Sequence, residues 1–423
     1  METIPRPPSA SCEVNANGHP LPLRWKRTIA IIWTGQAASI LATIAATFAV
    51  LWHITATADS ALMLSLAGIA SLLPVALLSP LGGVAADRFN KKHVTIVADS
   101  IAGVFSLALA VAVGVGFSSM LLLLSLLAAR ATAQAFHGPS LMALMPELVP
   151  ERDMVRINTL DQTLSSGSAI IGPVVGIALY TAWGFSAVLV MDALCAALAC
   201  LCLAVARLPY ARSDAPSSAG VTADLRDGAA AIAHDRPVAA LLVMVMLAML
   251  LFLPLGTLSP LMTYDWFGGD GFAASLVEAA AGIGLLVGSV AMLAWGGGKR
   301  LVGVLAVAGA LIGAGCIVCG LLPRDAFPVY VALIGLVFAA TAAFNAPVIP
   351  LMQKRVPAEK FGRVMGLFGS LSALASPVGL AIAGPAAEAL GVNRWFIVCG
   401  ALLVIAMIIA LASRPLRSLD EGA

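Results

Sequence analysis

The stretch that decides the fold is Leu81-Gly-Gly-Val-Ala-Ala-Asp87-Arg88-Phe-Asn90-Lys91-Lys92, which lies between two long apolar runs. It is the densest cluster of charge and glycine in the first third of the chain. Its small residues let two helices approach closely, and its three cations do not cross a bilayer. The carboxylate of Asp87 can interact favourably with the positive N-terminus of a neighbouring helix. We therefore expect a short cytoplasmic hairpin that links two transmembrane helices.

The flanking runs have the composition of a membrane protein. Of the 423 residues, 60% are hydrophobic and 11% are charged, whereas a soluble domain has roughly 25% charged residues. At about 1.5 Å per residue, an uncharged run of this length is enough to cross a hydrocarbon core of roughly 30 Å. The sequence therefore predicts an all-α polytopic membrane protein with twelve helices, at 28–52, 61–81, 94–114, 119–137, 159–181, 185–206, 238–263, 275–296, 301–321, 327–345, 363–384 and 393–413.

One polar stretch divides the chain into two halves. Residues 207–237 are rich in Pro, Ser and charged residues, and we expect them to be a cytoplasmic linker between two six-helix bundles, at 25–206 and 238–415. Residues 1–24 have the composition of a disordered cytoplasmic tail and lack the apolar core and cleavage site of a signal peptide. The last segment, 416–423, is expected to be a short C-terminal tail.

The basic residues indicate how the chain is oriented. Of the 24 Lys and Arg residues, all but Arg130, Arg324 and Arg394 fall on one side of the predicted membrane. Because basic loops stay in the cytoplasm, both termini are predicted to be cytoplasmic.

The two halves repeat each other. Phe136-His-Gly-Pro139 and Gly172-Pro-Val174 in the first half correspond to Phe344-Asn-Ala-Pro347 and Ser376-Pro-Val378 in the second, at offsets of 204 to 208 residues. Parallel six-helix repeats are the architecture of transporters in which one bundle moves against the other around a site at the membrane midplane.

On these residues the chain resembles the major facilitator superfamily. Gly83-x-x-x-Asp87-Arg88-x-Asn90-Lys91-Lys92 is similar to the family's signature between its second and third helices. Stretches 33–36, 136–151 and 361–370 are similar to the macrolide-efflux type and, more loosely, to siderophore exporters, and 376–384 with 391–396 is most similar to the macrolide-efflux group. The resemblance covers residues 25–415 and implies the major facilitator fold.

For the signature stretch, the resemblance implies a gate. In the outward-open state its aspartate would lie at the N-terminus of the eleventh helix, around residues 361–363, where the helix dipole contributes roughly 0.3 to 1 kcal/mol, or up to about 2 if the site is partly buried. The alternative is a plain positive turn without a gating role. The residues expected to gate are Gly83, Asp87, Arg88, Lys91 and Lys92.

Two features of this chain depart from the signature. Asn90 stands where the family usually has Gly, and since Asn tolerates a left-handed turn, we expect the turn to be retained. The corresponding stretch of the second half, Trp295-Gly-Gly-Gly-Lys-Arg300, has no acidic residue. The first half alone is therefore expected to carry the charge-based latch.

The fifth predicted helix contains Gly172-Pro173-Val-Val-Gly176. The run resembles the Gly-Pro motif of proton-coupled antiporters, which implies export. Glycines allow close helix packing, and Pro173 frees a carbonyl and kinks the helix. Helix packing without any bearing on the direction of transport is the alternative.

Charges inside the predicted helices are scarce and costly, at roughly 2.5 to 3.5 kcal/mol each on insertion scales. Arg130 resembles the fourth-helix arginine of drug antiporters. Arg130 and Asp192 are the most central charges, and we expect them to serve the proton and substrate pathway, with helix packing as the alternative for Asp192. Asp99 belongs to the same predicted pathway or is a packing pair. Glu278 is expected near the outer end of its helix, facing the outer water. Gln36 begins a polar stripe on the first helix that either lines a cavity or bonds to neighbouring helices.

No cofactor or metal chemistry is expected. Gly296-Gly-Gly-Lys299 lacks the spacing of a phosphate-binding loop, and there is no metal-spaced His cluster. Energy would then come from an ion gradient. The expected partners are a small-molecule substrate, protons or another coupling ion, and the lipid bilayer, with no nucleic acid and a monomer as the expected form.

These observations favour a secondary transporter in the bacterial plasma membrane, not an enzyme. We expect it to export a bulky amphipathic, macrolide-like drug in exchange for protons. A siderophore or other metabolite exporter on the same fold remains an alternative, as does an exporter assisted by an ATPase subunit. A transport-inactive sensor or scaffold is the alternative from another class.

Overall fold

The computed structural model describes residues 25–116, 119–206, 235–298 and 300–421. The predicted tail at 1–24 and most of the predicted linker at 207–237 lie outside these residues. Every long element is a helix, because a backbone in lipid has to satisfy its own hydrogen bonds. The first half contains α1 (Trp25–Ala58), α2 (Ala61–Arg88), α3 (Lys91–Gly114), α4 (Met120–Leu148), a 3-10 turn η1 (Glu151–Asp153), α5 (Met154–Trp183) and α6 (Phe185–Val205).

The second half repeats the order of the six long helices and adds three short elements, of which α15 is the last. A π-helical turn, η2, extends the first helix of this half, and a short helix, α12, precedes the fifth long one. Its elements are α8 (Arg236–Leu261), η2 (Met262–Trp266), α9 (Gly271–Trp295), α10 (Leu301–Leu321), α11 (Phe327–Asn345), α12 (Val348–Gln353), α13 (Ala358–Leu390), α14 (Val392–Ala412) and the terminal α15 (Arg414–Glu421).

Twelve of the described helices are long and apolar enough to cross a membrane, which confirms the predicted all-α fold. Several extend beyond their predicted ends. α2 continues through the signature stretch to Arg88 and leaves only Phe89 and Asn90 before α3, and α4 continues to Leu148 although it contains Pro139 and Pro146. Hydropathy falls where a helix leaves the lipid, but helical hydrogen bonding does not stop there. The expected hairpin is therefore a two-residue turn between two long helices.

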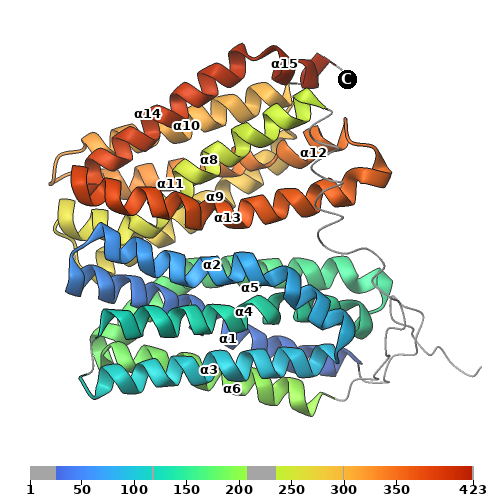
Figure 1. Cartoon of the computed structure of the whole chain (residues 1–423), viewed down its shortest axis with the longest axis vertical. Coiled ribbons are helices and arrows are strands. Elements are labelled where there is room, and N and C mark those ends of the chain that lie inside the picture. Colours follow the sequence, from blue (N-terminus) through green and yellow to red (C-terminus); the bar gives the residue numbers. More distant parts are fainter. Residues whose placement is uncertain (1–24, 117–118, 207–234, 299, 422–423) are drawn as a thin grey trace, which may run out of the picture.

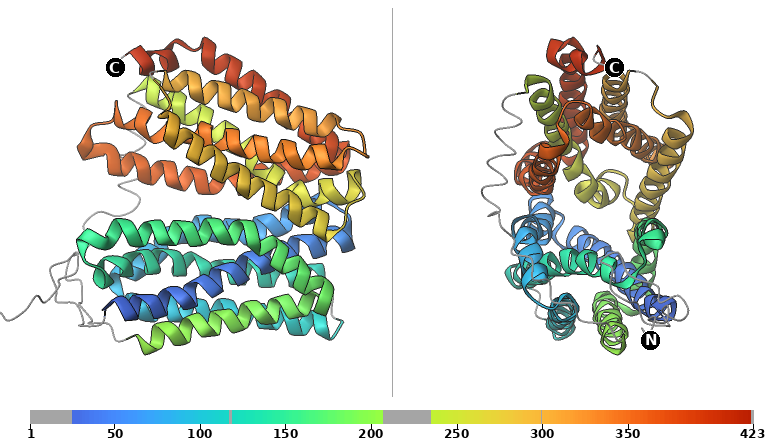
Figure 2. Two further views of the ribbon diagram at one scale, coloured as in Figure 1. Left: turned by 180° about the vertical axis from the view of Figure 1, so that it is seen from behind. Right: turned by 90° about the vertical axis from the view of Figure 1, so that its right-hand side faces the viewer.

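The described helices form two bundles, one from each half of the chain (Figures 1 and 2). In the first, α1 packs against α5 and α6, and α3 packs against α4 and α6. In the second, α10 packs against α11 and α14, and α9 packs against α11. Contacts between the bundles are made chiefly by α2 with α13 and by α5 with α9. These four helices form the seam along which the bundles meet.

We name the two ends of the molecule by their residues. The basic end carries the α2–α3 turn with Arg88 and Lys91, the start of α8 and the α12–α13 turn. The Ser60 end carries the α1–α2 turn and, across the seam, the α13–α14 turn at Gly391. Helices that start at one end finish at the other, so the two ends face opposite sides of the membrane.

At the Ser60 end the bundles are in close contact. Glu388 Oε2 in α13 accepts hydrogen bonds from Ser60 Oγ at 3.0 Å and from the backbone N–H of Leu62 at 3.1 Å. The rings of Trp52 and Tyr264 meet edge to face with centroids 5.9 Å apart. Polar and aromatic contacts between the halves thus close this end.

Toward the basic end, the same helices separate. A Cβ atom added at Gly83 in α2, or at Gly366 in α13, would have no neighbouring atom within 4 Å. α5 is packed against α9 at Ile170, only 2.6 Å from the position of a Cβ on Gly282, but Asp161 and Gln162 nearer the basic end are exposed. The structure is therefore closed at the Ser60 end and open at the basic end.

Glycines set the closest approach inside the first bundle. A Cβ on Gly172 of α5 would lie 2.7 Å from Ile44 Cγ2, and one on Gly176 would lie 2.4 Å from the carbonyl oxygen of Ala45 in α1. Gly167, in the same helix, has no atom within 4 Å of its Cβ position. The second and third helical turns before the end of α5 therefore pack directly against the α1 backbone.

We predict that a Ser65→Cys/Gly384→Cys pair forms a disulfide in a version of the chain without native cysteines. The Cβ position of Gly384 lies 2.7 Å from Ser65 Cβ, and a disulfide needs about 3.5 to 4.5 Å, so only a small shift is required. Mass spectrometry of the oxidised protein measures the yield. The matched pair Gly83→Cys/Gly366→Cys should cross-link poorly, and the reverse ranking would show that the basic end is the closed one.

We also predict that Gly176→Val destabilises the protein and that Gly167→Val does not. The added side chain at Gly176 meets backbone atoms of α1, which cannot rotate away, and overpacking of this kind costs about 1 to 3 kcal/mol. Thermal unfolding of the purified protein, followed by fluorescence-detected gel filtration, measures the difference. Equal stability of the two variants would contradict the close α1–α5 packing.

Candidate functional site

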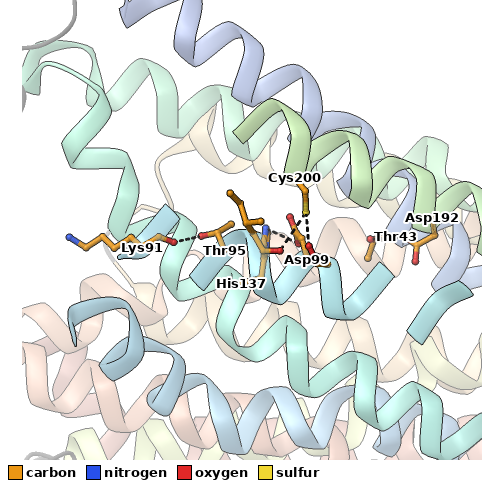
Figure 3. Close-up of polar contacts among 9 residues, drawn as sticks. Thr43, Lys91, Thr95, Asp99, His137, Asp192 and Cys200 are labelled. Carbon is orange, nitrogen blue, oxygen red and sulfur yellow. Dashed lines mark hydrogen bonds and ion pairs between the residues drawn. The ribbon is translucent and has the colours of Figure 1, made fainter. Parts of the chain in front are cut away.

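A line of buried polar residues runs through the first bundle along α3. Thr95, Asp99 and Ser106 are spaced by four and seven positions, so they share one helical face, and each is at most 3% exposed. This face meets α4 and α6. Figure 3 shows the line running from Lys91 at the basic end past Asp99 to Asp192 deeper inside. The first bundle therefore contains a polar track within an otherwise apolar core.

The deepest part of the track is an ion pair. Arg130 Nη2 of α4 lies 2.9 Å from Asp192 Oδ2 of α6, and both side chains are largely buried. Ser106 Oγ donates to Asp192 Oδ2 at 2.6 Å, and Thr43 Oγ1 donates to Asp192 Oδ1 at 3.0 Å. The two charges that the sequence singles out as central are therefore in contact, and helices α1, α3, α4 and α6 all meet at this carboxylate.

Fewer of the hydrogen-bonding groups of Arg130 are paired than of those of Asp192. Neither Nε nor Nη2 of Arg130 makes an aligned hydrogen bond to any residue that the structure describes. Its contact with Asp192 is thus an ion pair by distance, and the guanidinium, which carries five N–H donors, retains capacity for a further acceptor. The centre therefore pairs one carboxylate with one guanidinium, and the guanidinium retains N–H donors that are not hydrogen-bonded.

A second pair lies nearer the basic end. Asp99 Oδ1 is 3.3 Å from His137 Nε2 of α4, an ionic contact whenever the imidazole is protonated. Asp99 and Ser106 are seven residues apart, or about 10 Å along α3, so this pair and the Arg130 pair do not touch. Asp99 therefore has a partner of its own in α4, separate from the Arg130–Asp192 centre. His137 was not singled out from the sequence, although its position seven residues after Arg130 places it on the same face of α4.

The signature lysines bind their own bundle. Lys91 Nζ forms a salt bridge with Glu147 of α4, and Lys92 Nζ donates to the carbonyl oxygens of Ala204 and Ala206 at 2.9 and 2.8 Å. Lys92 thereby caps the C-terminal end of α6, where unpaired carbonyls favour a cation. Both lysines fix the α2–α3 turn to the first bundle.

The expectation of a left-handed backbone conformation at Asn90 is wrong. Asn90 has φ −65° and is the N-cap of α3, where its side chain accepts hydrogen bonds from the backbone N–H groups of Lys92 and His93. Asn is a strong N-cap because its carbonyl oxygen satisfies such orphan donors. Gly83 is likewise in helical backbone, within α2. The turn needs a cap here and does not need conformational freedom.

The remaining signature residues face outward. Asp87 and Arg88 are exposed at the end of α2, and Asp87 has no ion pair among the described residues. Because the two lysines hold the turn in place, Asp87 is left available on the surface of the first bundle in this open state.

The polar stripe of α1 does not act as one unit. Thr43 bonds to the central aspartate and Thr47 donates to the carbonyl oxygen of Thr43. Gln36 is 3% exposed, and its Oε1 has no hydrogen-bond partner among the described residues. The structure therefore brings Thr43, but not Gln36, to the Arg130–Asp192 centre.

The structure also places two other features predicted from the sequence. Gly172, Pro173 and Gly176 form the buried face of α5 against α1. Glu278 does not face the water at the Ser60 end, because it lines an internal hollow between α8, α9, α10, α11 and α14.

Comparisons with known proteins agree with this architecture. Macrolide efflux protein A of Streptococcus pyogenes is 29% identical over 397 residues, which cover 94% of this chain and 98% of that protein. Multidrug efflux pump Tap of Mycobacterium tuberculosis is 27% identical over 381 residues, which cover 87% of this chain and 89% of the pump.

Solved transporters share the fold at lower identity. The nucleoside transporter NupG matches with a TM-score of 0.71 and 13% identity, over 90% of this chain and 99% of its own. A POT peptide transporter in complex with alafosfalin matches with a TM-score of 0.68 and 14% identity, over 96% of both chains. The sequence profile of the Major Facilitator Superfamily matches residues 32–380, well over half of the chain. This protein, with its twelve membrane-spanning helices, therefore belongs to the Major Facilitator Superfamily and is a multi-pass membrane transporter, not an enzyme.

Proposed function

We propose that this transporter exports a bulky amphipathic drug of the macrolide type across the bacterial plasma membrane in exchange for protons. The observation that carries the proposal is the buried Arg130–Asp192 pair at the meeting point of four helices. The cargo is suggested by two relatives, a macrolide efflux protein and a multidrug efflux pump.

The pair supplies a physical means of proton coupling. Two opposite charges in contact are tolerated inside the membrane because each lowers the cost of burying the other. When a proton neutralises Asp192, Arg130 loses its counter-ion and favours another acceptor. Proton and substrate thereby compete at one centre, which is the requirement for exchange.

Orientation follows from the basic residues. Cytoplasmic loops are enriched in Lys and Arg, so we assign the basic end to the cytoplasm, with both termini on that side. The structure is open at this end, and an exporter takes up its substrate from the cytoplasm or the inner leaflet. The exposed polar residues Asp161 and Gln162 of α5 would face the entry route.

Asp87 would stabilise the opposite state. Lys91 and Lys92 hold the α2–α3 turn on the first bundle, so Asp87 moves with that bundle as a rigid unit. Closure of the basic end brings α2 toward α13, whose N-terminus at 358–363 is favourable for a carboxylate. The contact would exist only when the cytoplasmic side is closed.

We predict that Asp192→Asn reduces proton-driven efflux at least tenfold. In a drug-sensitive bacterium without its own pumps, the wild-type chain should keep labelled macrolide accumulation low, and a protonophore should raise it. Cells with the variant should accumulate macrolide as the empty vector does. Asp265→Asn, an exposed acid at the Ser60 end, is the matched control and should behave as wild type.

Two results of this assay would count against the proposal. Full gradient-driven efflux by Asp192→Asn would place proton coupling on another group. Accumulation in wild-type cells equal to the empty vector, with the protein verified in the membrane, would overturn the macrolide assignment and point to siderophores or other metabolites.

We predict that Asp87→Asn shifts the protein toward the state that is open at the basic end. Loss of a helix-dipole contact worth roughly 0.3 to 1 kcal/mol changes the ratio of the two states about two- to fivefold. The cross-linking rate of Ser65→Cys/Gly384→Cys measures this ratio, and it should rise. Glu151→Gln, an exposed acid at the same end, controls for loss of charge, and an unchanged rate in Asp87→Asn would contradict the latch.

A further inference from the structure

Glu388 of α13 supplies a hydrogen-bond acceptor to the start of a helix in the other bundle. Its Oε2 accepts from Ser60 Oγ at 3.0 Å and from the backbone N–H of Leu62 at 3.1 Å. Ser60 is the N-cap of α2, and its Oγ accepts from the backbone N–H of Met63 at 3.3 Å. The first N–H groups of a helix have no partner within that helix. Part of the cap of α2 therefore comes from α13, across the seam between the bundles.

The place of Glu388 within its own helix is electrostatically unfavourable. α13 ends at Leu390, two residues later, and the C-terminal end of a helix carries a partial negative charge that repels a carboxylate. The N-terminus of α2 carries a partial positive charge, so contact with α2 offsets this repulsion. The carboxylate is therefore most favourably placed while α2 and α13 are together at the Ser60 end.

The same arrangement occurs in reverse at the other end of this pair of helices. α2 and α13 lie side by side and run in opposite directions (Figure 1). Asp87 is the last residue but one of α2, and α13 begins at Ala358 on the basic end. Each helix thus carries, next to its C-terminal end, a carboxylate suited to the N-terminus of the other. The contact of Glu388 is formed in this structure, whereas Asp87 has no ion pair among the described residues.

We propose that Glu388 is the outer counterpart of Asp87, a latch that holds the Ser60 end closed, and that the two carboxylates stabilise opposite states of the transport cycle. The proposal rests on the alternation between two states in the proposed function and adds a residue that controls it. Loss of the Glu388 contact favours opening of the Ser60 end. Loss of the Asp87 contact favours opening of the basic end.

The test measures how often the Ser60 end opens, in purified protein in lipid nanodiscs without substrate or gradient. The reporter is Ile177→Cys in a chain without native cysteines, alkylated by a water-soluble maleimide. Ile177 of α5 is 1% exposed, and its Cδ1 lies 2.3 Å from the position of a Cβ on Gly271 of α9. This contact is on the α5–α9 side of the seam, so it reports opening of the whole end and not local loosening around Glu388.

Glu388→Ala should raise the alkylation rate at least about threefold, because the rate follows the fraction of molecules open at this end and a hydrogen-bonded charge is lost. Glu388→Gln, which keeps an acceptor and loses the charge, should give an intermediate rate. Asp59→Asn, an exposed acid next to Ser60, is the matched control and should behave as wild type. Asp87→Asn should lower the rate, and the double variant with Glu388→Ala should lie between the two single variants.

Three results would overturn the proposal. Equal rates in Glu388→Ala and wild type would show that the carboxylate does not hold the end closed. A rise at Ser65→Cys, on the α2–α13 side, without a rise at Ile177→Cys would show local loosening only. Cys399 is buried in the second bundle, and its alkylation in a chain that keeps it as the sole cysteine would attribute the rise to unfolding.

The outcome is separate from that of the proposed function. No transport is measured, so failure of macrolide efflux in cells does not decide the role of Glu388. An unchanged rate in Asp87→Asn alone would contradict the latch at the basic end and leave the result for Glu388 intact.

Discussion

The constraint on which the structure depends is that charge inside a hydrocarbon layer has to be compensated by the protein itself. Arg130 and Asp192 meet this constraint together, at 2.9 Å, with Ser106 and Thr43 completing the shell of the carboxylate. Four helices contribute to one buried centre, so their relative positions are coupled to its charge. Removal of either charge would leave the other uncompensated inside the first bundle.

The two bundles repeat a fold but not its polar content. The first has a track of paired groups that ends in Lys91 and Lys92, which hold the α2–α3 turn against α4 and α6. The second has Glu278 in a hollow lined mainly by aromatic and aliphatic side chains. The two halves therefore share a fold and differ in the polar groups that they contain.

Small residues set how closely the helices approach each other at the two ends of the molecule. At the Ser60 end, Gly384 allows α13 to lie directly against Ser65 of α2, while at the basic end Gly83 and Gly366 of the same two helices face open space. Within the first bundle, Gly176 similarly allows α5 to lie directly against the α1 backbone. Helix interfaces built from small residues pack tightly because no bulky side chain holds the backbones apart.

The sequence by itself determined the number of spans, the two halves and the choice of Arg130 and Asp192 as central charges, because hydropathy, repeats and the scarcity of membrane charges are written in the order of the residues. It did not determine that these two side chains are in contact. It did not determine where helices end outside the lipid, since α2 and α4 continue past the apolar runs. It also missed the partner of Asp99, the capping by Lys92 and Asn90, and the enclosure of Glu278. Those features depend on which faces of distant helices meet, and only the tertiary structure decides that.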